Sequence, residues 1–231
     1  MALPKLEVPK YTLTIPSSGD VIEYRPFLVK EEKNLMIAQE TGDDSAQVDA
    51  MVGIIEACTF NKLDINKLTT YDVEYIFLQI RAKSVGETAD ITLPCEKSGK
   101  RKQVTINLTE AYVANVDSFE SEKVVKITDD VGLTLRPFTL SHLRTIGENS
   151  DITRTVKLLI HSIYDADGVY LADESSDAEL TEFIESLPHK ALEEISTYME
   201  SIPALVMDVE FTGSTGHKNK IQLKGLNSFF V

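Results

Sequence analysis

The pattern that most suggests chemistry lies in an acidic stretch near residue 170. Asp165, Asp167, Gly168 and Glu174 occupy the third, fifth, sixth and twelfth positions of an EF-hand calcium loop. The first position, however, would be Ile163, which offers no side-chain oxygen to Ca²⁺. An Asp-Gly turn between two structural elements explains the same residues. A calcium-binding module or a cryptic enzyme that uses this loop is therefore a remote alternative.

The histidines and cysteines form no recognisable catalytic or metal-binding pattern. His142, His161, His189 and His217 lie far apart and lack the His-x-x-x-His or Glu-x-x-His spacing of metal sites. We interpret His161 as a structural histidine, because its neighbours are apolar residues of a predicted helix. Cys58 lies on an apolar helical face, where cysteine packs as a small hydrophobic residue, and no Gly-x-Ser-x-Gly motif is present. We expect no enzymatic activity, catalytic residue, bound metal or cofactor.

One glycine-containing segment, residues 213–216, superficially resembles a phosphate-binding loop. Its spacing is too short for Gly-x-x-x-x-Gly-Lys-Ser/Thr, and a predicted strand follows it where a helix is required. The segment is better explained as a hairpin turn.

The composition narrows the classes of partner and the compartment. The chain has 231 residues, with 37 acidic and 23 basic residues and a net charge of −14. This charge repels nucleic acid and anionic membranes, although it also serves solubility alone. Cys58 and Cys95 are far apart, which favours a reducing cytoplasm. Neither a signal peptide nor a membrane span is expected.

The elements that would position these residues follow a pattern that occurs twice. In each copy, two short alternating runs flank a Gly-containing turn, which predicts a β-hairpin. The second run ends in Arg25-Pro26-Phe27 in the first copy and in Arg136-Pro137-Phe138 in the second. Proline lacks a ladder donor, so it ends the strand and a helix can follow. Chance similarity of the two triplets is the alternative explanation.

Helices and a second hairpin follow in each copy. Apolar spacing predicts helices over 48–58, 70–82, 140–146, 155–163, 177–187 and 190–199. The closing hairpins are predicted over 89–94 with 103–108 and over 205–212 with 220–226. We therefore predict an α+β protein of two pseudo-repeated halves, each ordered as hairpin, two or three helices, and hairpin. The halves are 1–118 and 119–231, joined by the polar residues 115–123.

Two groups of residues are candidates for binding a partner. A basic cluster at the predicted hairpin turn contains Lys97, Lys100, Arg101 and Lys102. It is either a solvated tip or a docking point for an acidic protein, including a second copy through its acidic stretch 173–182. The terminal Phe229, Phe230 and Val231 either enter the chain's own core or anchor a partner.

Several segments resemble a known family. They are residues 3–9, 11–16 and 25–33, together with the ending that runs from Gly225-Leu226 to Phe229-Phe230. Across nearly the whole chain the sequence resembles the baseplate hub assembly proteins of T4-like contractile-tailed phages, the myoviruses. This resemblance implies a late phage protein that acts in the host cytoplasm during tail assembly, as a chaperone or as a minor hub component.

One departure from the family concerns zinc. The proteins that this sequence resembles often carry Cys-x-x-Cys pairs in the hairpins, whereas this chain keeps Cys95, followed three residues later by Ser98, and has no cysteine in 211–216. Ser98 and Gly99 form a turn by ordinary hairpin chemistry. We therefore expect purified protein to contain no zinc.

Our leading functional hypothesis is a non-catalytic baseplate hub assembly protein that binds other hub proteins, with self-association as a further option. The alternative is a permanent structural subunit of the virion tail baseplate. Neither nucleic acid nor a membrane is expected as a partner.

Overall fold

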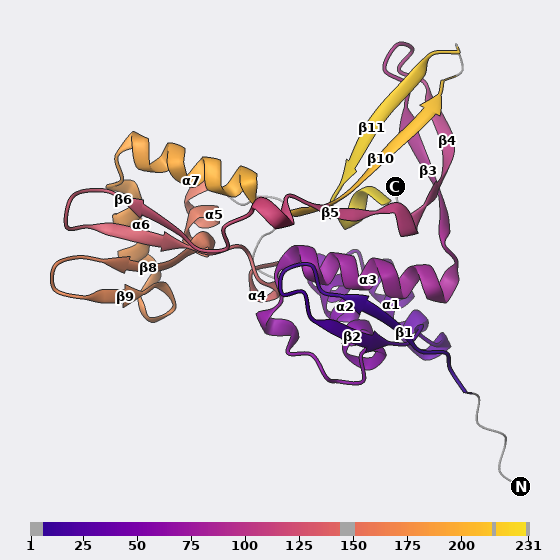
Figure 1. Cartoon of the computed structure of the whole chain (residues 1–231), viewed down its shortest axis with the longest axis horizontal. Coiled ribbons are helices and arrows are strands. Elements are labelled where there is room, and N and C mark those ends of the chain that lie inside the picture. The colour runs from indigo at the N-terminus through magenta and orange to yellow at the C-terminus, as the bar shows by residue number, and fades with distance from the viewer. Residues whose placement is uncertain (1–6, 144–150, 214–215, 230–231) are drawn as a thin grey trace, which may run out of the picture. The chain divides into compact units, whose positions relative to one another are not determined.

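The structure, a computed structural model, describes residues 7–143, 151–213 and 216–229 (Figure 1). Helices and several small antiparallel sheets make up these residues, which confirms the predicted α+β class. They pack into two compact units. The first unit combines the described chain up to Ala114 with the segment from Ala204 onward, and the second spans Asn115–Pro203.

The first unit combines helices with two hairpins and a three-stranded sheet, whose strand order is β11-β10-β5. Its elements, with η denoting a 3-10 helix, are β1 (Tyr11–Thr14), β2 (Val21–Tyr24), α1 (Val29–Thr41), α2 (Asp44–Cys58), η1 (Ile65–Lys67), α3 (Thr70–Val85), β3 (Thr88–Pro94), β4 (Arg101–Asn107), η2 (Leu108–Glu110), β5 (Tyr112–Ala114), β10 (Ala204–Thr212), β11 (Lys218–Lys224) and η5 (Leu226–Phe229).

The first predicted hairpin is confirmed. Strands β1 and β2 pair antiparallel, with Tyr11 opposite Tyr24, around a turn in which Gly19 adopts a φ of 73°. This positive φ favours glycine, because a Cβ atom would be strained there. The Arg25 N–H then donates to the Cys58 carbonyl at 3.0 Å, which joins the end of the hairpin to the end of α2.

Helix α3 supplies much of the core of the first unit. The Thr69 side chain accepts from the Asp72 N–H, and the Asp72 carboxylate accepts from the Thr69 N–H, so a capping box fixes the start of the helix. Further along, Leu78 packs in one buried cluster with Ile91 of β3 and Leu205 of β10. Burying each of these side chains contributes about 1.5–3 kcal/mol, so the hairpins are held against α3 by apolar contact.

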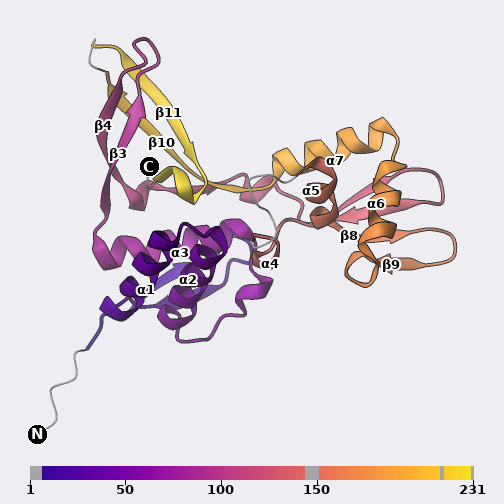
Figure 2. The ribbon, with the colours of Figure 1, turned by 180° about the vertical axis from the view of Figure 1, so that it is seen from behind.

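The second unit is a four-stranded antiparallel sheet, ordered β6-β7-β8-β9, with helices packed beside it (Figure 2). Its apolar core is formed by both layers, including Val125 of β6, Leu133 of β7 and Ile195 of α7. Its elements are η3 (Val116–Ser118), β6 (Lys123–Lys126), β7 (Gly132–Leu135), α4 (Leu140–Leu143), α5 (Ile152–Leu159), β8 (Ile160–Tyr164), β9 (Val169–Leu171), η4 (Ala172–Glu174), α6 (Asp177–Glu185) and α7 (His189–Ser201).

The predicted helix over 155–163 is wrong in its second half. Helix α5 ends at Leu159, and Ser162 and Ile163 belong to strand β8. Ser162 pairs with Thr134 on one side and with Leu171 on the other. Apolar and polar residue types do not alternate strictly along this short strand, so they can mimic helical spacing over a few residues. The predicted helix over 140–146 is described only as far as Leu143, and its remainder lies outside the described residues.

The compact units do not follow the order of the chain. The closing hairpin β10–β11 belongs to the predicted half 119–231, yet β10 pairs with β5 of the first unit, with Val206 opposite Tyr112. Pairing of this kind depends on contacts between distant residues, which local patterns do not reveal. The predicted halves follow the order of the sequence, whereas the compact units follow how the elements pack.

Candidate functional site

The predicted basic cluster lies at the turn of the β3–β4 hairpin. Lys97, Lys100, Arg101 and Lys102 are all exposed. The turn is closed by the Cys95 N–H, which donates to the Lys100 carbonyl at 2.9 Å. The hairpin therefore presents these cations on a fixed backbone and not on a loose loop.

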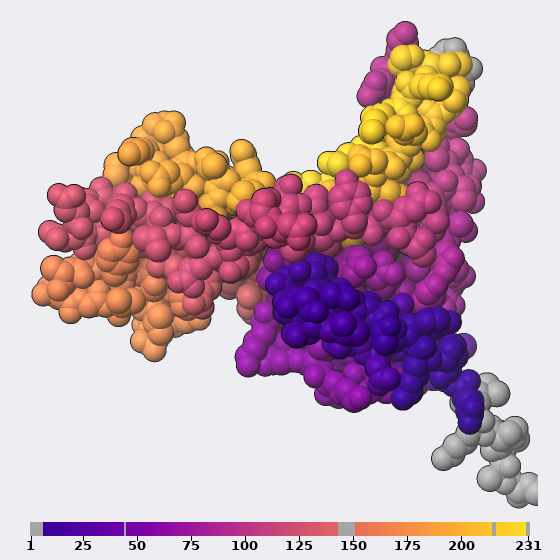
Figure 3. All heavy atoms as spheres, viewed as in Figure 1, coloured from indigo at the N-terminus to yellow at the C-terminus, as the bar shows by residue number. Residues whose placement is uncertain are grey.

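A second hairpin, β10–β11, brings more basic residues to the same place. We call the two hairpins together, residues 88–107 and 204–224, the arm; they form one continuous projection of the first unit (Figures 1 and 3). The residues of the arm end, as we use the term, are Lys97, Lys100, Arg101, Lys102, His217 and Lys218. Sequence reasoning identified only the β3–β4 part, because the pairing of two hairpins so distant in the chain leaves no local signal.

A buried asparagine joins the two hairpins. Asn219 of β11 is only 2% exposed, and its Oδ1 accepts from the Glu96 N–H at 3.0 Å. Its Nδ2 donates to the His217 carbonyl at 3.0 Å and to the Phe211 carbonyl at 3.5 Å. One side chain therefore satisfies backbone groups of both turns, which fixes their separation.

Two further contacts hold the turns of the two hairpins together. The Lys102 ammonium donates to the Thr212 carbonyl at 2.5 Å. A Cβ atom added to Gly213 would lie 2.5 Å from the Cys95 sulfur, so glycine is needed for the close approach of the two turns. Hydrogen bonds from Ser98 and Asn219 lower the pKa of the Cys95 thiol. In the part of the chain that the structure describes, no three histidine, cysteine or acidic side chains form a cluster that could hold a metal.

The arm differs in charge from the rest of the protein. It carries seven lysines and arginines against four acidic residues, whereas the remaining residues carry 16 basic and 33 acidic side chains. The whole-chain charge of −14 therefore conceals a positively charged arm. Clustered charge on a projecting surface steers association with a surface of opposite sign.

Comparison with known proteins identifies the family of this chain. The family described as "T4 bacteriophage base plate protein" matches residues 8–231. The chain belongs to this family. The match confirms the family resemblance found from the sequence segments. No curated protein and no solved structure matches the chain.

The remaining candidates of this base plate protein lie elsewhere. Phe229 is completely buried in the core cluster of the first unit, as expected if it enters the chain's own core. Phe230 and Val231 lie outside the described residues. Among the described residues, no helix is both long and apolar enough to cross a bilayer.

The acidic loop is the turn between β8 and β9, as the Asp-Gly alternative predicted. The Asp165 carboxylate accepts from the N–H groups of Asp167 and Gly168 at 2.8 and 3.0 Å. The Tyr170 hydroxyl donates to the same carboxylate. Hydrogen bonds of an ordinary turn thus account for Asp165, the side chain at the third position of the calcium-loop pattern.

The other reactive side chains have structural roles. Cys58 is completely buried, and burial raises the pKa of its thiol to about 11, which disfavours the nucleophilic thiolate. His161 lies in β8, not in a helix, with its Nδ1 3.4 Å from the Arg136 guanidinium. Burial lowers the pKa of His142, whose Nδ1 accepts from the Thr139 N–H at 3.2 Å.

Proposed function

We propose that this base plate family member is a non-catalytic assembly protein of the baseplate hub, which binds other base plate proteins in the host cytoplasm. The observation that carries the proposal is the arm end, a rigid basic surface on an otherwise acidic chain. Family membership supplies the class of partner, namely other proteins of the base plate.

The geometry of the arm favours protein binding. Its cations stand on two hairpins whose turns are joined through Asn219, so little conformational entropy is lost when a partner binds. Exposed charges act mainly on the rate of association and on specificity, and salt screens them. The partner surface should therefore be acidic, and binding should weaken as ionic strength rises.

Charge reversal tests this role. The protein carrying Lys97→Glu, Lys100→Glu and Lys218→Glu is co-expressed with base plate proteins of the same phage and captured by an affinity tag. We expect association of the variant at low salt to be slower by at least about tenfold, because steering is lost. Capture and association rates equal to those of the unmodified protein would refute the docking role of the arm.

A matched control reverses three exposed lysines of the second unit, with the substitutions Lys123→Glu, Lys126→Glu and Lys190→Glu. The two variants have the same net charge, so a general effect of charge would reduce capture equally. Only a local effect at the arm end would separate them.

A permanent structural subunit is the second candidate, since the family is named for the base plate itself. Mass spectrometry of purified virions separates the two roles. A fixed copy number in mature particles would identify a subunit, whereas presence during assembly and absence from particles supports the assembly role.

We further propose that the two sequence halves arose by internal duplication. In the first, the Arg25 N–H donates to the Cys58 carbonyl at 3.0 Å; in the second, the Arg136 N–H donates to the Leu159 carbonyl at 2.9 Å. Each bond joins an Arg-Pro-Phe triplet to the last residue of a helix.

A second pair of matching bonds supports the duplication. The Leu28 N–H donates to the Glu31 carboxylate at 2.7 Å, and the Thr139 N–H donates to His142 Nδ1 at 3.2 Å. Each donor directly follows the triplet, and each acceptor lies three residues later. An experimental structure in which these bonds do not coincide after superposition of 11–58 on 124–159 would refute the duplication.

A further inference from the structure

The second unit has two sheet edges of different character. Strand β6 at one edge begins with Lys123, ends with Lys126 and is packed against α7. Lysines and a covering helix are common protections of an edge strand against pairing with another chain. Strand β9 at the other edge consists of Val169, Tyr170 and Leu171, without lysine or proline.

The apolar side chains of β9 are exposed. Val169, Tyr170 and Leu171 are 68%, 47% and 38% exposed, respectively. These residue types favour strands, yet here they bury little surface within the chain. Among the described strands, β9 pairs only with β8, and exposed apolar residues on such an edge are the features that an added strand uses for recognition.

The hydrogen-bond pattern between β8 and β9 determines which backbone groups of β9 point away from β8. The Asp165 N–H donates to the Gly168 carbonyl at 3.0 Å, so this pair is bonded. Bonded pairs alternate in an antiparallel ladder, and the Tyr164–Val169 pair next to it is therefore unbonded. The N–H and C=O of Val169, together with the Leu171 N–H two residues on, face the open edge. The Leu171 carbonyl also faces outward, where it accepts from the Ser175 hydroxyl at 3.0 Å.

Strand β9 is already held in its extended form. On one side, the Asp165 carboxylate accepts from the Asp167 and Gly168 N–H groups. On the other side, the Ser175 N–H donates to the Ala172 carbonyl at 3.1 Å, which closes η4. A partner strand would therefore meet a preorganised edge and need not order it.

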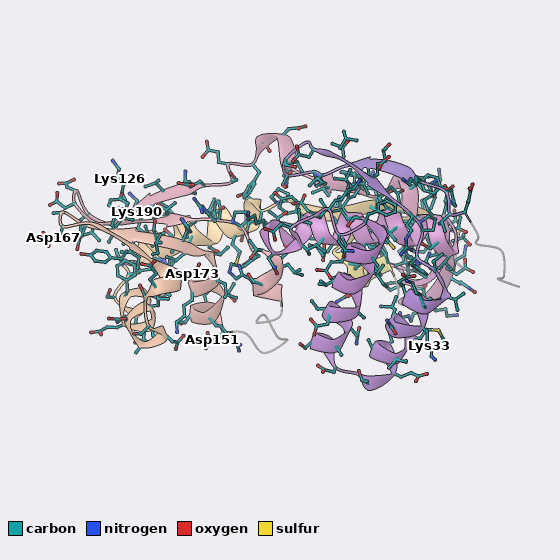
Figure 4. All side chains as sticks on the ribbon, turned by 90° about the horizontal axis from the view of Figure 1, so that it is seen from below. Lys33, Lys126, Asp151, Asp167, Asp173 and Lys190 are labelled. Carbon is teal, nitrogen blue, oxygen red and sulfur yellow. The ribbon has the colours of Figure 1, made fainter. Side chains whose placement is uncertain are left out.

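The chain segments that flank β9 are acidic. Asp165 and Asp167 precede the strand and Asp173 and Glu174 follow it, with Asp167 and Asp173 labelled in Figure 4. Residues 165–185 contain eight carboxylates and no lysine or arginine. An incoming strand with basic residues at its ends would be attracted, and an acidic one would be repelled.

This charge disfavours pairing of β9 with β9 of a second copy. Antiparallel self-pairing would bring Asp167 of one copy close to Asp173 of the other, and opposed like charges destabilise a strand pair. The favoured occupant is a different protein. We propose that β9 accepts an extended segment of another base plate protein, with alternating apolar residues flanked by lysine or arginine, as an added antiparallel strand.

Labelled peptides test the proposal on the full chain. The probe is Lys-Lys-Thr-Val-Thr-Val-Thr-Val-Lys-Lys, and its comparison has the same core flanked by two glutamates at each end. Binding is measured by fluorescence anisotropy at low and high salt. We expect the basic probe to bind, more weakly at high salt, and the acidic one to show no binding. Equal binding of both peptides, or binding of neither, would overturn the proposal.

Two substitutions locate the binding at β9. Val169→Pro removes an outward N–H that has no ladder partner, and Val169→Lys places a charge on the edge. We expect Val169→Pro to weaken binding of the basic probe by about fivefold or more, the effect of losing one backbone hydrogen bond. Val169→Lys should weaken it as well, because the added lysine repels the lysines of the probe. The matched control Val124→Lys changes the 49% exposed valine of β6 and should leave binding unchanged. An equal loss in the control would place the peptide elsewhere.

Two further measurements separate the remaining explanations. Thermal melting monitored by circular dichroism shows whether each variant is folded, and a folded Val169 variant with unchanged peptide binding refutes the proposal. Sedimentation of the protein alone tests the second copy, because self-association abolished by Val169→Lys would make that copy the occupant. Charge reversal of Lys97 and Lys100 should not affect peptide binding. The docking role of the arm and the strand-pairing role of β9 can therefore be refuted separately.

Discussion

Replacement of Asn219 by leucine is the sharpest test of how the arm is built. Leucine has the same number and branching of side-chain heavy atoms as asparagine, but its side chain can neither donate nor accept a hydrogen bond. The substitution therefore leaves the Glu96 N–H and the His217 and Phe211 carbonyls without their side-chain partner, while the apolar contacts of the site are kept.

The expected loss of stability follows from these bonds. Two of them are 3.0 Å long, and the third, to Phe211, is 3.5 Å long and weak. A typical hydrogen bond contributes about 1 kcal/mol, and an unpaired buried group costs about 1–3 kcal/mol. Because the Glu96 N–H lies close to the surface, water can replace part of its bond. We therefore expect Asn219→Leu to lower the free energy of unfolding by about 2–3 kcal/mol.

Urea denaturation measures this loss, and hydrogen exchange locates it. The Glu96 amide should exchange faster in the variant, because its acceptor is gone. The matched control is Asn227→Leu, which makes the same change at an exposed asparagine of η5 in the same unit. An exposed position away from buried bonds should change stability by no more than about 0.5 kcal/mol.

Two outcomes would contradict the reasoning. A loss of stability no larger than that of the control would mean that Asn219 does not join the hairpins. Unchanged exchange at the Glu96 amide, together with lower stability, would place the defect elsewhere in the first unit. Capture of base plate partners should also weaken, since the arm end keeps its charge but loses its fixed geometry.

Three further substitutions test other contacts. Burial raises the pKa of Glu31, but hydrogen bonds, the largest from Arg25, outweigh this effect and leave the pKa lowered. Glu31→Gln should therefore destabilise the folded protein at pH 7 and have little effect once the pH is below the folded-state pKa of Glu31. Burial raises the pKa of Glu74, so its carboxylate costs stability as the pH rises above the unfolded value; Glu74→Gln should stabilise at pH 7 but not at low pH, as urea titrations at several pH values would show. Gly213→Ala should destabilise by about 1–3 kcal/mol through its clash with the Cys95 sulfur, and Cys95→Ala should restore part of the loss in the double variant.

The local elements of this protein could be predicted well from its sequence. The Arg25-Pro26-Phe27 triplet ended a strand and began a helix because proline acts on its immediate neighbours. The β3–β4 and β10–β11 hairpins were recognised from their turn residues for the same reason. Strand β8 was mistaken for the end of a helix, because the residue types of its five positions, Ile-His-Ser-Ile-Tyr, show no clear alternation of apolar and polar side chains.

The family and the basic turn of residues 97–102 were determined by the sequence alone, since both depend on residue types along the chain. The joining of that turn to His217 and Lys218, the burial of Phe229 and the open edge of β9 were decided only by the tertiary structure. Glu96 and Asn219 are 123 residues apart, and their bond forms because the apolar sides of both hairpins are buried in one core. No local pattern encodes that choice of neighbour, which is a property of the packed chain as a whole.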